Sequence, residues 1–196
     1  MKIIKENAFY EQNINKSRFL GFSFIVNTED EVEKILKDMQ NKYCDCRHIV
    51  YAYKIYPNIE KKGNSSEPAG TAGAPILSAI EKNDLTNVLI VVVRYFGGIL
   101  LGAKNLYRAY SSTALEVILL SGTKEMRKYY CYKLNLSYSE YNNIKLLSEK
   151  NDNIKILNTT FSSGICSKIA ISEFLDNPLI NKLILEQQVT AEEIWL

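Results

Sequence analysis

The sequence has little of the features that assign a protein to a class at once. Its 196 residues include a single histidine, a single tryptophan and four prolines, and 24 lysine and arginine residues nearly balance 22 aspartate and glutamate residues. The resulting net charge of +2 excludes the strong positive field of a dedicated nucleic-acid coat protein. Any contact with nucleic acid must therefore come from a local patch of charge.

Long apolar runs are missing as well. The longest run, VLIVVV at residues 88–93, is too short to span a bilayer, and the N-terminus reaches Glu6 and Asn7 before any apolar core of signal-peptide length. We therefore expect a cytoplasmic protein with no membrane partner. The apolar share of 46% is that of a globular chain, and the length allows one sizeable core or two small domains.

The chain also lacks the cysteine and histidine spacing of a metal site. Its four cysteines, Cys44, Cys46, Cys131 and Cys166, form no C-x-x-C pair, and no histidine pair accompanies them. We expect no metal and no cofactor, and we interpret the thiols as small apolar side chains in a reducing compartment. The segment CDCRH keeps a catalytic cysteine open as an alternative, although no setting that would activate a thiolate can be read there.

The first part of the chain alternates strand and helix patterns. A strand at 17–26 precedes a capping box formed by Thr28 and Glu31, and apolar residues at helical spacing follow. Residues 57–73 hold enough Pro, Gly, Asn and Ser to predict one long loop. The other predicted elements are a strand at 47–56, a short helix at 74–82, a strand apolar on both faces at 86–95, a long helix at 103–121 stopped by Gly122, and an extra strand near the N-terminus.

The pattern after Gly122 is that of a second, smaller domain. Its elements follow the β-α-β-β-α-β order of the ferredoxin-like fold. We therefore predict an α+β protein, with an α/β domain at 1–123 and a ferredoxin-like domain at 124–196. The signals are strands at 124–137, 154–161, 165–172 and 192–196, a capping box at Ser137 and Glu140, and a helix that opens at Pro178 with Asp176 or Asn177 as its cap.

Two glycine-rich segments each stand before a predicted helix. Helix starts leave backbone N–H groups unpaired, and glycine lets a phosphate oxygen approach them, so the segments suit phosphate binding. Neither segment is a Walker loop or a dinucleotide fingerprint, and packing stays open as an alternative because tight turns and close helix–strand contacts use glycine in the same places. The residues are Gly70, Thr71 and Gly73 in the first segment and Gly97, Gly98 and Gly102 in the second.

Basic residues flank the second glycine segment. Arg94 ends an apolar strand and Arg108 lies on the helix beyond the glycines, so both guanidiniums, with Lys104, are predicted to face one phosphate. A structural ion pair between Arg94 and Glu67 is the alternative. Glu67 could also bind a metal or act as a base. His48, the single histidine, could act as a general base, stack on a nucleobase or simply be hydrogen-bonded in its strand.

The second domain has its own basic and aromatic stretch, MRKYYCYK at 126–133. Arg127 and Lys128 interleave there with tyrosines that include Tyr130, a composition that holds and stacks single-stranded RNA on open sheet faces. Tyrosine also favours strands in general, so an ordinary strand with a solvated outer face is the alternative.

The two glycine segments are similar to a known signature. SSEPAGTAGAPIL followed by NVLIVVVRYFGGILLGAKNLYRAYS resembles the IMPACT (YigZ-type) family in its bacterial two-domain form, and KSRFLGF and HIVYAYKI extend the likeness over residues 15–120. The resemblance implies a first domain with the α/β fold of domain IV of elongation factor G and a ferredoxin-like second domain. It also implies a shared set of motif positions, namely His48, Glu67, Pro68, Gly70, Thr71, Gly73, Arg94, Gly97, Gly98, Gly102, Arg108 and Tyr110.

The resemblance further implies a function near the ribosome, since eukaryotic relatives are linked to translational control. We therefore expect a cytosolic, non-enzymatic binding protein linked to translation regulation, which contacts RNA phosphate or a ribosome-associated partner through the glycine and arginine surface. One alternative is an enzyme or sensor that binds a small phosphorylated metabolite or nucleotide. Another is a working surface on the second domain, with purely architectural glycines in the first.

The chain departs from the family pattern in both glycine segments. Asn64, Ser65 and Ser66 stand where relatives usually have two acidic residues and a glycine, which argues against a metal or acid–base role for that loop. Lys104 and Asn105 stand where further small residues are usual. Their side chains restrict how closely a ligand can approach the backbone there, and Lys104 adds one positive charge.

Overall fold

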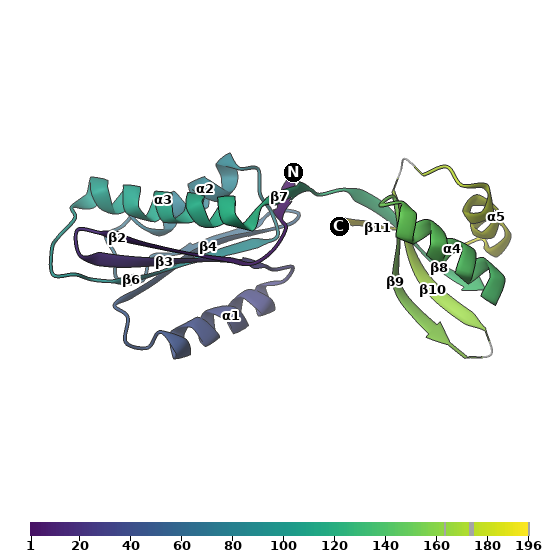
Figure 1. Cartoon of the computed structure of the whole chain (residues 1–196), viewed down its shortest axis with the longest axis horizontal. Coiled ribbons are helices and arrows are strands. Elements are labelled where there is room, and N and C mark those ends of the chain that lie inside the picture. Colours follow the sequence, from purple (N-terminus) through teal and green to yellow (C-terminus); the bar gives the residue numbers. More distant parts are fainter. Residues whose placement is uncertain (163, 173–174, 196) are drawn as a thin grey trace. The chain divides into compact units, whose positions relative to one another are not determined.

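The computed structural model describes residues 1–162, 164–172 and 175–195, and the chain divides into two compact units, Met1–Glu125 and Met126–Leu196 (Figure 1). Both units contain helices and strands, so the predicted α+β class is confirmed. The short strands β1 (Lys2–Ile4) and β7 (Thr123–Glu125) pair antiparallel, which ties the end of the first unit to its beginning. The boundary expected near Thr123 therefore falls inside a strand of the first unit.

The first unit is built on a five-stranded antiparallel sheet with the order β2-β3-β6-β4-β5. Its central strand β6 is buried from Val88 to Arg94, as predicted for a strand that is apolar on both faces. The strands are β2 (Ala8–Ile14), β3 (Ser17–Ile25), β4 (His48–Ile55), β5 (Ile59–Gly63) and β6 (Val88–Tyr95).

Helices cover both faces of this sheet. Helix α1 (Glu29–Lys42) covers one face, and helices α2 (Gly73–Lys82) and α3 (Ala103–Ser121) cover the other (Figure 1). Successive residues of a strand point to opposite faces, so β6 contributes to both cores, with Val91 on the α1 side and Val92 on the α2 and α3 side. This double burial explains why the strand reads as one continuous apolar run.

Helix ends in the first unit follow the sequence signals. Thr28 caps α1 and accepts a hydrogen bond from the Glu31 N–H at 3.2 Å, as predicted. The Glu31 carboxylate accepts the N–H of Asn27 at 2.7 Å, one residue earlier than the expected box. Helix α3 ends at Gly122, whose φ of +59° lies in the left-handed region that favours glycine.

The long loop predicted at 57–73 is wrong in its first part. Residues Ile59–Gly63 form β5, which pairs antiparallel with β4. This strand lies at the sheet edge and most of its side chains are exposed, so no apolar alternation marks it in the sequence. Backbone pairing with β4, which a local pattern does not display, decides its structure. The connection that remains between β5 and α2 carries Glu67.

The elements of the second unit follow one another along the chain as β-α-β-β-α-β. Its four strands form an antiparallel sheet in the order β11-β8-β10-β9. This arrangement confirms the predicted ferredoxin-like fold. The elements are β8 (Lys128–Leu136), α4 (Tyr138–Lys150), β9 (Ile154–Phe161), β10 (Ile165–Ser172), α5 (Pro178–Gln187) and β11 (Glu192–Trp195).

The capping residues in the sequence correctly predicted where both helices of the second unit begin. Ser137 and Glu140 form the predicted capping box at the start of α4. Asn177, rather than Asp176, caps α5 by accepting from the first backbone N–H groups of the helix. No helix in the described part of the chain is long and apolar enough to cross a membrane.

The strand expected at 124–137 is divided in the structure. Its first residues belong to β7 and pair with β1, whereas Lys128–Leu136 joins the sheet of the second unit. The division follows from a long-range pairing with the N-terminus, which the local pattern could not reveal. Leu196, the last residue of the strand expected at 192–196, lies outside the described residues.

Candidate functional site

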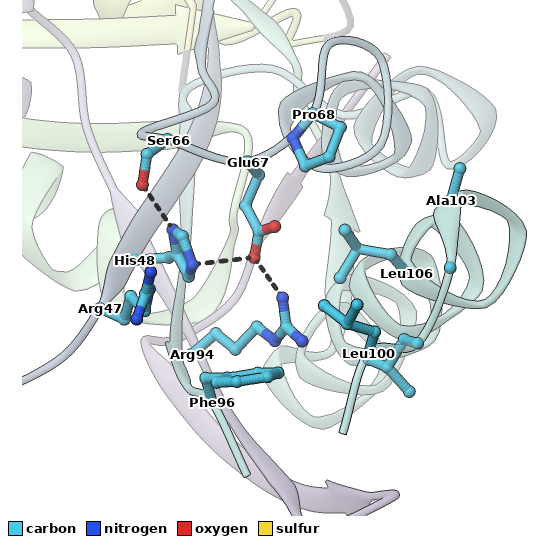
Figure 2. Close-up of a pocket in the computed structure, with 12 residues that line it drawn as sticks. Arg47, His48, Ser66, Glu67, Pro68, Arg94, Phe96, Leu100, Ala103 and Leu106 are labelled. Carbon is cyan, nitrogen blue, oxygen red and sulfur yellow. Dashed lines mark hydrogen bonds and ion pairs between the residues drawn. The ribbon is translucent and has the colours of Figure 1, made fainter. Parts of the chain in front are cut away.

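A pocket opens in the first unit where β4, β6 and the start of α3 meet. His48 begins β4 and Arg94 lies near the end of β6, and the two residues are paired across the strands, which places their side chains next to each other. Both side chains are buried. The β5–α2 connection brings the buried Glu67 to the same place, as Figure 2 shows.

Backbone turns hold this connection in shape. The Glu67 N–H donates to the Asn64 carbonyl at 3.1 Å, and the Asn64 side chain accepts the Gly73 N–H at 2.8 Å. The N–H and the hydroxyl of Thr71 both donate to the Pro68 carbonyl, at 3.1 and 2.7 Å. The Gly73 N–H and the Thr71 hydroxyl are therefore already in use, and the first glycine segment does not offer them to a phosphate.

Glu67 is the centre of a buried polar cluster. Its Oε1 accepts hydrogen bonds from Arg94 Nη1 at 2.7 Å and from the Tyr110 hydroxyl at 2.8 Å. The same oxygen lies 3.7 Å from Nε2 of His48 (Figure 2). The Arg94–Glu67 ion pair that the sequence left as an alternative is therefore present, and each charge compensates the other in the interior. These contacts all go to Oε1.

Burial sets the protonation states around Glu67. Removal from water lowers the pKa of His48 below its usual value, against the smaller opposing effect of the Glu67 carboxylate, so the ring is neutral at neutral pH. Burial, together with the Glu67 charge, raises the pKa of Tyr110, so the hydroxyl keeps the proton that it donates. The other ring nitrogen of His48, Nδ1, lies 3.0 Å from Ser66 Oγ.

Arg94 keeps unused hydrogen-bonding capacity although it is buried. Nη2 donates to Ser17 Oγ at 3.4 Å, but Nε has no hydrogen-bond partner in the described part of the chain. The guanidinium carbon lies 5.4 Å from the centre of the Phe19 ring and 5.5 Å from that of Phe96, so aromatic rings hold the group in place. Buried donors are normally satisfied, so the unpaired Nε is an unusual feature of this cluster.

The pocket has a cavity volume of about 410 Å³ and combines this polar cluster with apolar side chains. Arg47 lies at its exposed edge, with its guanidinium carbon 6.0 Å from the centre of the Phe96 ring. The start of α3 borders the pocket, and its cap, Gly102, supplies no side-chain hydrogen bond to the first N–H groups. The lining residues are Arg47, His48, Ser66, Glu67, Pro68, Arg94, Phe96, Leu100, Leu101, Gly102, Ala103 and Leu106.

The residues predicted from the sequence divide into two groups. His48, Glu67, Arg94 and Gly102 line the pocket, and Tyr110 contacts Glu67. Lys104 and Arg108 are exposed on α3 and do not belong to the lining. The pocket is thus built around Arg94 and Glu67, whereas the prediction combined Arg94 with Arg108. Among the described residues there is no cluster of three or more side chains suited to a metal ion.

The remaining glycines lie outside the pocket lining, and packing explains one of them directly. A Cβ at Gly97 would lie 2.0 Å from the carbonyl oxygen of Lys16, so the close approach of two backbones requires glycine there. Gly70 and Gly98 have φ values of +77° and +84°, with open space where a side chain would lie. They serve backbone turns.

Sequence reasoning missed Arg47, Phe96 and Ser17 as parts of the site. Arg47 directly precedes His48, and Phe96 directly follows β6. Their positions next to predicted site residues in the sequence could have identified them as candidates. Ser17 had no such signal. It reaches Arg94 because β3 pairs with β6, and that pairing is a property of the tertiary structure.

The basic and aromatic stretch of the second unit does not present a row of open rings. Tyr130 lies on the same face of β8 as Leu134, toward the core of this unit, and the Lys128 ammonium sits 5.1 Å from the centre of the Tyr130 ring. Lys128 also pairs with Glu193 at 2.8 Å, and Arg127 is exposed. On the other face Tyr129 is buried and donates to a backbone carbonyl. These contacts are compatible with the ordinary strand that the sequence left as an alternative, and RNA binding by this stretch stays a prediction.

Known proteins match most of this chain. The family of the Impact N-terminal domain matches residues 15–118. The chain is 37% identical to the IMPACT family member YvyE of Bacillus subtilis over 126 residues, which is 63% of this chain and 58% of that protein. It is 30% identical to an IMPACT family member of Haemophilus influenzae over 175 residues, 86% and 84% of the two chains. A crystal structure of a hypothetical protein, 23% identical, has a TM-score of 0.68 with 98% of this chain and 95% of that chain covered, a likeness of fold.

Proposed function

This chain belongs to the family of the Impact N-terminal domain, and on that premise we propose that it is a translation-linked binding protein whose pocket receives a phosphate group of RNA. The resemblance to a family whose eukaryotic members are linked to translational control supports the biological context. The observation that carries the proposal is Arg94, a buried guanidinium at the pocket whose Nε has no partner among the described residues.

Positive potential from several sources favours an anion in the pocket. Arg47 adds a cation at the edge, and the start of α3 contributes the positive end of a helix dipole, equivalent to about half an elementary charge. The charge of Glu67 is offset by Arg94, and burial keeps His48 neutral. The balance around the cavity is therefore positive, which supports a phosphate group as the ligand.

The apolar side chains of the pocket suit the rest of a nucleotide. Phe96 is partly exposed beside Arg47, and Leu100 is 87% exposed on the connection that leads to α3. A single-stranded nucleotide whose phosphate lies at the helix start would place its base against these side chains, and bases stack on aromatic rings without regard to sequence. We therefore infer binding of single-stranded RNA with little sequence preference.

A fluorescence anisotropy titration with a labelled single-stranded RNA tests this proposal. Wild-type protein is expected to bind more tightly at about 50 mM than at about 200 mM salt, because phosphate contacts release counterions. The variant Arg47→Ala should bind more weakly, with the slope of log K against log salt reduced by about 1. Arg47 is exposed, so the substitution leaves the fold intact.

Arg108→Ala is the matched control, because Arg108 is an exposed arginine outside the pocket lining. Its affinity should equal that of the wild type. Weaker binding by Arg108→Ala with unchanged binding by Arg47→Ala would move the contact from the pocket to the exposed face of α3. The proposal fails if wild-type protein binds no RNA at low salt and does not sediment with ribosomes from a cell extract.

The concave shape of the site favours a second candidate, a sensor or enzyme for a small phosphorylated metabolite or nucleotide. A volume of about 410 Å³ lies within the usual range of small-molecule pockets. Thermal-shift measurements with nucleotides and sugar phosphates test this candidate. A ligand present at a hundred times its dissociation constant stabilises the folded state by about 2.7 kcal/mol, and the absence of a shift with any of these ligands would exclude it.

A further inference from the structure

Ser66 and His48 form a hydrogen-bonded pair at the edge of the pocket. Ser66 Oγ lies 3.0 Å from His48 Nδ1, and Ser66 is exposed whereas His48 is buried. On the far side of the imidazole, Nε2 lies 3.7 Å from Glu67 Oε1, so the ring stands between a hydroxyl and a carboxylate (Figure 2). This order of groups is that of an activated serine nucleophile.

We propose that Ser66 is a nucleophile toward small carboxylic esters, with His48 as its general base and Glu67 as the residue that positions His48. The proposal goes beyond RNA binding, since it assigns a covalent chemistry to side chains that a phosphate contact does not use.

The proposed chemistry uses one tautomer of His48. In it Nε2, the nitrogen that lies 3.7 Å from Glu67 Oε1, carries the ring proton, and Nδ1 accepts from the Ser66 hydroxyl. Burial lowers the pKa of His48, so the ring is a neutral base at neutral pH. The negative charge of Glu67 favours the imidazolium that forms when Ser66 gives up its proton.

A tight turn presents Ser66 to the pocket. The Glu67 N–H donates to the Asn64 carbonyl at 3.1 Å and closes the turn, with Ser65 and Ser66 at its centre. Ser65 has a φ of +52°, in the left-handed region that a non-glycine side chain adopts only at a cost. Nucleophilic serines of hydrolases also sit on sharp, strained turns that expose the hydroxyl.

The pocket supplies the other parts that an ester needs. Phe96, Leu101 and Leu106 line it with apolar surface for an acyl group. Arg47, at the exposed edge of the pocket, provides a cationic donor for the oxyanion that develops on the carbonyl oxygen.

The reaction balances with water as its co-reactant. Ser66 Oγ forms a bond to the ester carbonyl carbon while His48 Nδ1 takes the hydroxyl proton. The bond from that carbon to the ester oxygen then breaks, and the leaving alcohol takes the proton from His48. Water next gives a proton to His48 and adds its oxygen to the acyl carbon. The carboxylic acid leaves, and Ser66 recovers its proton.

Labelling with an alkyl fluorophosphonate tests the proposal on the full-length protein. The probe phosphonylates activated serines with loss of fluoride, so intact-mass spectrometry should show a single adduct, and peptide mapping should place it on Ser66. Ser66→Ala should lose the adduct. Ser65→Ala, which removes a hydroxyl from the neighbouring residue of the same turn and lies outside the pocket lining, should be labelled at the wild-type rate.

A substrate assay and a pH profile complete the test. Wild-type protein should hydrolyse 4-nitrophenyl butyrate, and Ser66→Ala should not. The rate of labelling should fall as pH decreases below the usual histidine value of 6.5, because protonated His48 cannot accept the serine proton. Glu67→Gln should move the midpoint of this profile to lower pH, and Glu67→Asp should return it toward the wild-type value.

Each contrary result overturns a named part of the proposal. No adduct on folded wild-type protein, or an adduct that persists in Ser66→Ala, excludes Ser66 as a nucleophile. Labelling without turnover of the ester excludes the hydrolysis step. A midpoint unchanged in Glu67→Gln excludes the positioning role. These assays contain no RNA, so their failure and the failure of RNA binding are separate outcomes.

Discussion

Arg94 and Glu67 form a buried ion pair, with 2.7 Å between Nη1 and Oε1 and side chains that are 5% and 4% exposed. Arg94 belongs to a strand and Glu67 to a loop, 27 positions apart in the chain. Glu67 therefore already uses one nitrogen of Arg94 and compensates its charge in the interior. Arg94 Nε has no hydrogen-bond partner among the described residues.

Removing the carboxylate from this pair should destabilise the protein strongly. Glu67→Ala leaves Arg94 as an uncompensated buried charge, and the free energy of unfolding should fall by about 3–5 kcal/mol. Urea denaturation measures the effect. Glu60→Ala, at an exposed position of the edge strand β5, is the control and should change stability by less than about 0.5 kcal/mol. Equal effects of the two substitutions would contradict the role of Glu67 in compensating the buried charge of Arg94.

The Tyr110 hydroxyl should contribute through its bond to the same carboxylate oxygen. Tyr110→Phe removes a 2.8 Å hydrogen bond to a charged, buried acceptor and should lower the free energy of unfolding by about 1.5–3 kcal/mol. Tyr107→Phe, on the same helix but 40% exposed, is the matched control and should be nearly neutral. A neutral effect of Tyr110→Phe would mean that Arg94 alone satisfies Glu67.

Stability should depend on pH through His48. Its pKa is lowered in the folded state, by burial first, with Arg94 and Arg47 also lowering it and Glu67 opposing them. Below 6.5 the unfolded chain therefore binds a proton that the folded chain does not, so stability is lost as pH falls from 6.5 toward the folded-state pKa. Above 6.5 this contribution is fully present.

The difference between wild type and His48→Gln isolates this effect from the titration of carboxylates. Urea denaturation at pH values on both sides of 6.5 should show a smaller stability difference on the acidic side, because only the wild type loses the contribution of His48. A difference that is constant over this range would contradict the assignment.

Gly97 and Gly98 should respond differently to alanine. Gly98→Ala meets open space at a φ of +84°, so it should lower stability by about 1–2 kcal/mol through the backbone alone. Gly97→Ala places a Cβ 2.0 Å from the Lys16 carbonyl oxygen, and the backbones must move apart. Thermal denaturation should therefore show a larger loss for Gly97→Ala. The reverse order would remove the packing explanation for Gly97.

Local signals were sufficient wherever a residue acts on its own neighbours in the chain. Thr28, Ser137 and Asn177 cap helices as their positions indicate, and Gly122 ends α3. These effects involve hydrogen bonds within a few residues, and the amino-acid types alone express them. The same holds for β6, whose continuous apolar run reflects burial on both faces.

Edge positions and cross-strand contacts were not predictable in this way. The strand β5 carries no apolar alternation because its side chains are exposed, and only its pairing with β4 makes it a strand. Arg108 was predicted to join Arg94 because both flank the same glycines, yet it is exposed outside the pocket, and Arg47 takes a place there instead.

Patterns in the sequence predicted the helix ends, most of the strands, the family and the candidates His48, Glu67 and Arg94. How these candidates contact one another depends on the fold, because the register of β3, β6 and β4 sets which side chains are neighbours. Burial lowers the pKa of His48 and so keeps its ring neutral, and Arg94 and Glu67 compensate each other as a buried ion pair. A local sequence pattern reveals neither the strand register nor the burial of a side chain, so the pocket and the Ser66–His48 pair could be found only in the folded structure.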